Sequence, residues 1–152
     1  MKKILMAASS GGHLEEILAL KQLKEQYETV LVTEKTEYEV RFWQDKVYLF
    51  PQMNRREWKG VLDFFKCFPA AAKILREENP DAVLSTGAMM SFPFLLMAKL
   101  QKRKTIFIEC LFNVDAPTLT GKLAYSFVDL FLVQWPEMLK VYPKAVLGGR
   151  VF

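Results

Sequence analysis

The chain has 152 residues, of which 51% are hydrophobic and 25% carry a formal charge. This composition is typical of a globular domain and excludes an intrinsically disordered chain. The net charge of +4 at pH 7 is too weak to indicate nucleic-acid binding. No apolar run approaches the roughly 18 residues of a membrane-spanning helix. We expect no secretory signal, since few apolar residues follow the opening Met-Lys-Lys, and a single domain over residues 1–152.

Short apolar runs alternate with amphipathic segments along the whole chain. Val30-Leu31-Val32 and Ile106-Phe107-Ile108 are near-continuous apolar runs, which is the pattern of parallel strands buried on both faces. We predict strands at residues 3–8, 29–33, 46–50, 81–86, 104–110 and 129–134, and helices at residues 13–25, 36–44, 58–78, 92–102, 118–126 and 135–141. The sequence therefore predicts an α/β fold with a single doubly wound, mainly parallel, Rossmann-like sheet.

Three positions are expected to shape these helices. Ser91 precedes Phe92-Pro93 and is expected to cap a helix that has proline in its first turn. Asn79-Pro80 is expected to end the long helix over residues 58–78. Pro69 lies inside that helix and is expected to break or kink it.

A glycine turn, Ser9-Ser10-Gly11-Gly12-His13, joins the first predicted strand to the first predicted helix. A helix N-terminus offers free N–H groups and the positive end of a dipole, and glycine lets a ligand approach the backbone. His13 is the only histidine and can titrate near neutral pH. The turn lacks the GxGxxG and P-loop patterns. We interpret Ser10, Gly11, Gly12 and His13 as a nucleotide or diphosphate site; the alternative is an ordinary tight turn.

Three further polar segments are expected at the carboxyl ends of strands, where ligands collect in a doubly wound sheet. They are residues 85–88, which include Thr86 and Gly87, residues 109–120, and residues 134–137. For each segment the alternative is a loop that is polar without binding anything.

Neither cysteine indicates a metal site. Cys67 and Cys110 lack metal-ligand spacing, and each lies in an apolar stretch, so we expect buried free thiols in a reducing cytosol. The sequence has no Asp-x-Asp motif. We therefore expect no metal and no cofactor.

Five motifs in order carry a resemblance to a known family. They are Ser9 to Leu14, Asn79-Pro80-Asp81 with Ser85 to Ala88, Ile108-Glu109 with Pro117 to Leu123, Phe131 to Met138, and Tyr142 to Ala145. Together they resemble the oligosaccharide-biosynthesis family typified by asparagine-linked glycosylation protein fourteen. The nearest branch is the bacterial exopolysaccharide and capsule version, of PssD/CpsF type.

This resemblance implies the N-terminal, acceptor-side half of a GT-B glycosyltransferase that is split into two polypeptides. A small partner chain, forming a heterodimer, is then expected to supply the C-terminal half and most of the nucleotide-sugar site. The complex is expected to transfer a sugar from a nucleoside-diphosphate sugar, such as a UDP-sugar, to a lipid-pyrophosphate-linked saccharide. Eukaryotic members carry a transmembrane anchor; here we expect peripheral association with the cytoplasmic face of a bacterial membrane.

Two functions remain open at this stage. The chain is either an enzyme subunit or a non-catalytic anchor that recruits and stabilises a catalytic partner. A stand-alone nucleotide-binding domain is disfavoured, because we find no acidic residue at the end of the second strand in a Rossmann context.

With the resemblance, individual residues acquire expected roles. His13 is the base for the acceptor hydroxyl or a hydrogen-bond donor to phosphate. Glu109 is a base or binds sugar hydroxyls; its alternative is to cap a neighbouring helix. Asn113 and Asp115 are expected to hold acceptor hydroxyls. Thr118 and Thr120 are read as helix caps, and Glu15 and Glu16 as structural or interfacial.

Residues 58–76 of the helix predicted at 58–78 combine aromatic and basic side chains. Lys59, Lys66 and Lys73 recur every seven residues, and Trp58 and Phe65 lie among them. Basic residues beside aromatic ones suit an anionic membrane surface, with residues 92–104 as a second candidate. The alternative for both is a core-packing helix with a solvated basic face.

Overall fold

A computed structural model describes residues 1–35, 46–53 and 58–151, so the predicted helix at 36–44 lies outside the described residues. Within them, seven parallel strands form one sheet in the order β3-β2-β1-β4-β5-β6-β7. The strands are β1 (Lys3–Ala8), β2 (Glu28–Glu34), β3 (Lys46–Phe50), β4 (Ala82–Gly87), β5 (Lys104–Ile108), β6 (Leu130–Val133) and β7 (Val146–Leu147). The predicted parallel sheet is confirmed, and β7, only two residues long, was missed.

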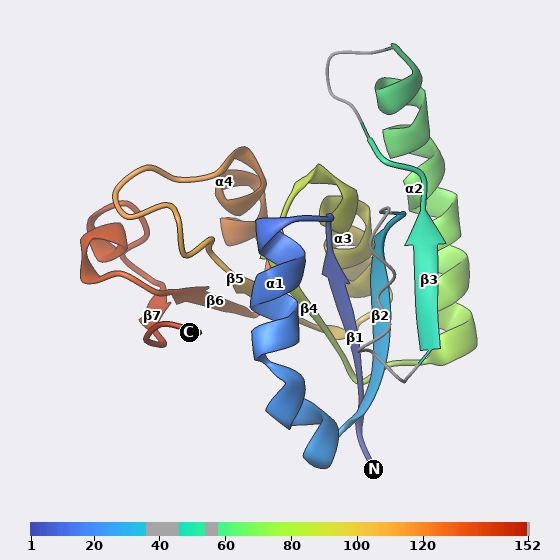
Figure 1. Cartoon of the computed structure of the whole chain (residues 1–152), viewed down its shortest axis with the longest axis horizontal. Coiled ribbons are helices and arrows are strands. Elements are labelled where there is room, and N and C mark those ends of the chain that lie inside the picture. The colour runs from blue at the N-terminus through green and yellow to red at the C-terminus, as the bar shows by residue number, and fades with distance from the viewer. Residues whose placement is uncertain (36–45, 54–57, 152) are drawn as a thin grey trace.

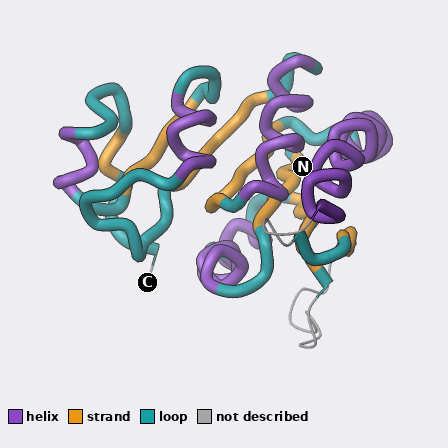
Figure 2. Tube along the Cα trace, turned by 90° about the horizontal axis from the view of Figure 1, so that it is seen from above, coloured by secondary structure: helices purple, strands orange, loops and turns teal. Residues whose placement is uncertain are grey.

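Helices cover both faces of this sheet (Figures 1 and 2). The α-helices are α1 (Gly12–Ala19), α2 (Trp58–Glu78), α3 (Phe92–Leu100) and α4 (Leu119–Tyr125). The 3-10 turns are η1 (Lys21–Glu25), η2 (Met89–Ser91) and η3 (Pro136–Lys140). Side chains alternate along each strand, so Leu5 of β1 packs on the α2 and α3 side while Met6 packs on the α1 side.

Three details of the helices differ from the sequence predictions. The helix predicted at residues 13–25 ends at Ala19 and continues as η1, because a 3-10 turn puts Leu20 and Leu23 on one side, against the sheet. Pro69 lies within α2, which runs unbroken as one helix. Ser91 precedes α3 without capping it; its hydroxyl donates to the Gly87 and Ala88 carbonyls instead.

The strand order reverses between β1 and β4, which are neighbours in the sheet although their first residues, Lys3 and Ala82, are 79 positions apart in the chain. Chains leaving the carboxyl ends of two such strands diverge to opposite faces, and ligands bind in the crevice between them. The glycine turn follows β1, and η2 follows β4. The fold therefore brings two of the predicted polar segments together.

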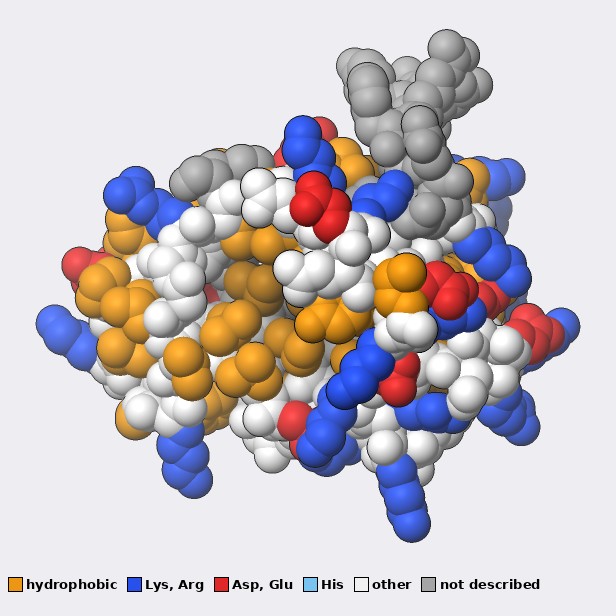
Figure 3. Space-filling view, turned by 90° about the horizontal axis from the view of Figure 1, so that it is seen from below, with side chains coloured by type: hydrophobic (Ala, Val, Ile, Leu, Met, Phe, Trp, Pro, Cys, Tyr) orange, Lys and Arg blue, Asp and Glu red, His pale blue; other side chains and the backbone are white. Residues whose placement is uncertain are grey.

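An apolar area remains on the α1 face beyond the helix itself. Leu132 of β6 pairs with Val146 of β7, so both side chains lie on one face, next to the cluster that α1 covers. Val146 is 51% exposed and Leu130 is 36% exposed. Figure 3 shows hydrophobic side chains gathered on the half of the molecule that carries the last strands. Surface of this kind often marks a contact site for another chain.

Candidate functional site

The glycine turn starts α1 without help from any side chain. Gly11 has φ +86° and ψ −143°, a conformation that L side chains rarely adopt, and the cap makes no side-chain hydrogen bond. The Gly11 carbonyl accepts from the backbone N–H groups of Leu14 and Glu15. The positive end of the helix is thus presented at the carboxyl edge of the sheet.

His13 is fixed to the end of β4 by two reciprocal hydrogen bonds. Its Nδ1 atom lies 2.9 Å from the Thr86 carbonyl oxygen, and the Thr86 hydroxyl donates to the His13 carbonyl at 2.7 Å. Gly87 has φ +124°, and a Cβ atom there would lie 2.8 Å from the His13 ring. Glycine at this position is therefore required for the ring to lie where it does.

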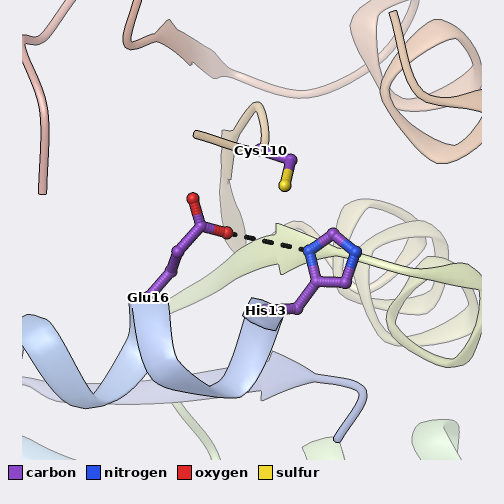
Figure 4. Close-up of side chains that lie close together, drawn as sticks. All are labelled: His13, Glu16 and Cys110. Atoms are coloured by element: carbon purple, nitrogen blue, oxygen red, sulfur yellow. Dashed lines mark ion pairs between the residues drawn. The ribbon is translucent and has the colours of Figure 1, made fainter. Parts of the chain in front are cut away.

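The buried Glu16 carboxylate and the Cys110 thiol lie on the Nδ1 side of the His13 ring (Figure 4). Glu16 Oε2 is 3.7 Å from His13 Nδ1, and Cys110 completes a trio whose ligand-type atoms lie within 4.8 Å of one another. The second ring nitrogen points away from Glu16 and Cys110 (Figure 4). Burial lowers the pKa of His13, but the interactions of the ring with Cys110 and Glu16 and its hydrogen bond to the Thr86 carbonyl outweigh the effect of burial and raise the pKa to about 10.

The same trio has the residue types of a metal site, His, Glu and Cys. A cation bound at His13 Nδ1 would have to displace the hydrogen bond to the Thr86 carbonyl. The Nδ1 atom is thus already engaged by a hydrogen bond, and the absence of a metal stays an expectation.

Ser10 of the turn is held by Glu34, the last residue of β2. The Ser10 backbone N–H and hydroxyl donate to Glu34 Oε2 at 3.2 and 3.1 Å, and Met53 N donates to Oε1. The statement that no acidic residue ends the second strand was therefore wrong, because β2 extends one residue further than predicted. A hollow of about 110 Å³ lies beside Glu34 and Ser9. A larger one, about 420 Å³, lies at the opposite edge near Lys46 and Glu78, away from the turn.

Glu109 is buried, with 1% of its surface exposed, and its carboxylate is occupied by the chain itself. It accepts from the Thr118 hydroxyl at 2.8 Å, the Tyr142 hydroxyl at 2.9 Å and the Cys110 N–H at 3.0 Å. Thr118 in turn caps α4 by accepting from Gly121 N at 2.9 Å. This geometry favours the alternative in which Glu109 supports the start of a helix, and it confirms Thr118 as a cap.

Two other predicted acceptor-binding residues lie in the loop after β5. Asn113 donates to the Ala116 carbonyl at 2.7 Å, and Asp115 is exposed. Phe112 of the same loop approaches Gly12, where a Cβ atom would lie 3.1 Å from its ring. The loop therefore borders the glycine turn, although Asn113 is engaged within the loop.

The exposed side of α2 carries the predicted basic and aromatic residues. Trp58 is 82% exposed and Phe65 is 63% exposed, and the lysines at 59, 66 and 73 all face solvent. The opposite side, with Cys67 and Leu75, is buried. At its start α2 borders an apolar hollow of about 280 Å³ lined by Met53, Gly60, Val61, Phe64 and Met89. Among the described helices none is both long and apolar enough to cross a bilayer.

Residues 53–151 match the protein family described as Oligosaccharide biosynthesis protein Alg14 like. The chain belongs to this family. The UDP-N-acetylglucosamine transferase subunit ALG14 of Mus musculus is 28% identical over 179 residues, covering 98% of this chain and 82% of the relative. This Alg14-family chain is therefore a glycosyltransferase-related protein of glycan biosynthesis, and the predicted family is confirmed.

Longer proteins resemble this chain over part of their length. A UDP-N-acetylglucosamine–N-acetylmuramyl-(pentapeptide) pyrophosphoryl-undecaprenol N-acetylglucosamine transferase of Finegoldia magna is 31% identical over 102 residues, covering 65% of the Alg14-family chain and 27% of the enzyme. The crystal structure of Acinetobacter baumannii MurG superposes with a TM-score of 0.75 at 21% identity, covering 90% of this chain and 43% of MurG. The Alg14-family chain spans less than half of these two proteins, and its fold is that of the Rossmann-like N-terminal half of a GT-B enzyme.

Sequence reasoning missed two residues of this site. Glu16 was read as structural or interfacial, yet its carboxylate faces His13. The signal was present, because a residue three positions after His13 lies on the same side of a helix. Cys110 was correctly expected to be buried and free, but nothing in its spacing indicated that a loop 97 residues after His13 would bring it to the ring.

Proposed function

We propose that this chain is the acceptor-binding, membrane-associating subunit of a two-chain GT-B glycosyltransferase. In this proposal the complex transfers a sugar from a nucleoside-diphosphate sugar to a lipid-pyrophosphate-linked saccharide, in bacterial exopolysaccharide or capsule biosynthesis. The observation that carries it is the glycine turn with His13 at the crevice between β1 and β4. Family membership supports it, since the mouse relative is named a transferase subunit.

The chemistry of the turn suits a diphosphate. The N-terminus of α1 supplies oriented N–H groups and positive potential. His13, with its pKa raised to about 10, adds an ionisable ring beside them. Sugar transfer to a hydroxyl needs positive potential near phosphate and a base near the acceptor. We assign phosphate binding to the turn of this chain.

A partner chain follows from the architecture of the longer relatives. A GT-B enzyme closes its active site between two Rossmann-like domains, and the fold here corresponds to one of them. The exposed apolar area around Leu130 and Val146 is the surface we assign to the partner.

Peripheral membrane binding is assigned to the exposed side of α2. Trp58 and Phe65 can enter the interface while Lys59, Lys66 and Lys73 meet anionic headgroups. The start of α2 and the glycine turn both lie toward the carboxyl edge of the sheet (Figure 1). A lipid-linked diphosphate would then meet both surfaces at once.

A second candidate function is a non-catalytic anchor that recruits and stabilises the catalytic chain. One observation favours it: Glu109, one of two residues expected to do chemistry, is occupied by internal hydrogen bonds. The deciding experiment purifies the complex with its partner and measures transfer from radiolabelled UDP-sugar to a lipid-pyrophosphate acceptor. Loss of transfer in His13→Ala with an intact complex supports the subunit with a substrate site; retained transfer supports the anchor.

A further inference from the structure

The tautomer of His13 is fixed by its surroundings. A carbonyl oxygen can only accept a hydrogen bond, so Nδ1, which lies 2.9 Å from the Thr86 carbonyl, must carry a proton. The lone pair of the neutral ring, or the second proton of the charged ring, is then on Nε2. This atom points away from Glu16 and Cys110 (Figure 4), and the side chain is 24% exposed.

Glu16 has one carboxylate oxygen that accepts two hydrogen bonds and one that accepts none from the described residues. The residue is 0% exposed. Its Oε1 accepts from Leu111 N at 2.7 Å and from Gln134 Nε2 at 2.8 Å. Its Oε2 has no hydrogen-bond partner among the described residues and lies 3.7 Å from His13 Nδ1. A buried oxygen of this kind costs free energy unless a positive charge compensates it.

Each element packed around the ring contributes known groups. From α1 come Glu16 and the exposed Glu15; from the end of β4 comes the uncharged Thr86 carbonyl; from the segment after β5 comes the buried Cys110 thiol. Among the described residues, His13 is the one basic side chain that lies within 4.0 Å of a Glu16 carboxylate oxygen.

We propose that Glu16 is a positioning residue that keeps His13 protonated on both ring nitrogens at neutral pH, so that Nε2–H donates to a phosphate oxygen and His13 does not act as the base. A charged imidazole has no lone pair with which to accept a proton from a sugar hydroxyl. The base must then come from elsewhere in the complex. The ligand in this assignment rests on the proposed function, whereas the charge state of His13 does not.

The charge state can be measured directly because His13 is the only histidine in the chain. Nitrogen-15 NMR of the imidazole across pH 5–11 reports both the tautomer and the titration midpoint. We expect the wild type to titrate well above the ordinary value of about 6.5. Glu16→Gln should lower the midpoint by at least about 1 pH unit, the scale for losing a nearby opposite charge.

The matched control is Glu15→Gln, which removes the same charge one residue away on the exposed side of α1 and should leave the midpoint unchanged. Cys110→Ser distinguishes the effect of the thiol on the midpoint from the effect of the Glu16 carboxylate. A wild-type midpoint at or below about 6.5 overturns the proposal even if Glu16→Gln fails to fold. An equal shift in both glutamate variants, or a shift only in Cys110→Ser, also overturns it.

Inorganic pyrophosphate separates this inference from the proposed function. Titrated into the free chain, pyrophosphate should change the nitrogen-15 chemical shift of His13 Nε2. Its binding near pH 8 should weaken in Glu16→Gln and not in Glu15→Gln. A high midpoint that depends on Glu16, with no response to pyrophosphate, supports the positioning role and counts against the phosphate assignment. A response to pyrophosphate with an ordinary titration midpoint supports the phosphate assignment and counts against the positioning role of Glu16.

Discussion

His13 and Thr86 exchange two hydrogen bonds, ring to carbonyl at 2.9 Å and hydroxyl to carbonyl at 2.7 Å, although 73 positions separate them in the chain. His13 lies in the first turn of α1 and Thr86 is the last residue but one of β4, so the bonds join both sides of the crevice at the point where the strand order reverses. The ring is therefore positioned by rigid elements on both sides rather than by a loop. Sites held in this way are preorganised for their ligand.

The first prediction concerns His13 in the assembled enzyme. His13→Ala should lower the turnover of the complex by about 10²-fold or more, the usual effect of removing one preorganised donor, without unfolding the chain. Steady-state transfer kinetics and circular dichroism on the same samples test this. An unchanged rate together with an unchanged KM for the acceptor would leave His13 with a structural role only.

The second prediction concerns the pH dependence of stability. The folded pKa of His13 is raised from about 6.5 to about 10, so the folded state holds a proton that the unfolded state has lost between these values. The stabilisation is fully present below pH 6.5 and is lost as the pH rises toward 10. The free energies of unfolding of the wild type and of His13→Gln, measured in urea, should therefore converge as the pH rises through this window. Because Cys67 also has a raised pKa, of about 11, the difference between the two proteins is the quantity to follow; parallel curves contradict the prediction.

The third prediction concerns Glu109. Glu109→Ala strands the donors of Thr118, Tyr142 and the Cys110 backbone, and should lower the free energy of unfolding by at least about 2 kcal/mol. Glu109→Gln keeps part of this network and should retain transfer in the complex. A well-folded Glu109→Gln complex with a 10²-fold lower turnover, about the effect of losing a general base, would restore Glu109 as a catalytic residue.

The sheet could be predicted because buried parallel strands leave near-continuous apolar runs, as at Val30 to Val32 and Ile106 to Ile108. Strand β7 could not, because its pair Val146 and Leu147 is too short to have a period. The glycine turn carries its own local signal. The pairing of His13 with Cys110 carries none, since it depends on how far the segment after β5 folds back over α1. For the same reason Glu109, at the edge of an apolar run, could not be told from a cleft residue until Tyr142 was known to cover it.

The fourth prediction concerns the partner. The isolated chain should transfer no sugar, and addition of the partner should restore activity. Val146→Asp, at an exposed apolar position, should abolish the complex in size-exclusion chromatography without unfolding the chain, because a charge would be buried in the contact. The matched control is Leu49→Asp on β3 at the other edge of the sheet, where the exposure is also 51%. Robust transfer by the chain alone, or equal loss in both variants, contradicts the assignment.

The fifth prediction concerns the membrane. Each basic side chain near an anionic surface contributes about 1 kcal/mol, so replacing Lys59, Lys66 and Lys73 with glutamate should weaken binding to phosphatidylserine vesicles by at least about 10²-fold. High salt should have a similar effect, because the attraction is screened. The control replaces three exposed lysines elsewhere with glutamate and so changes the net charge by the same amount; they are Lys21, Lys122 and Lys144. Activity on membrane-embedded acceptor should fall with vesicle binding, while a soluble acceptor analogue should react normally. If neither salt nor the α2 substitutions release the protein, the exposed face of α2 is only solvated and the anchor is on the partner.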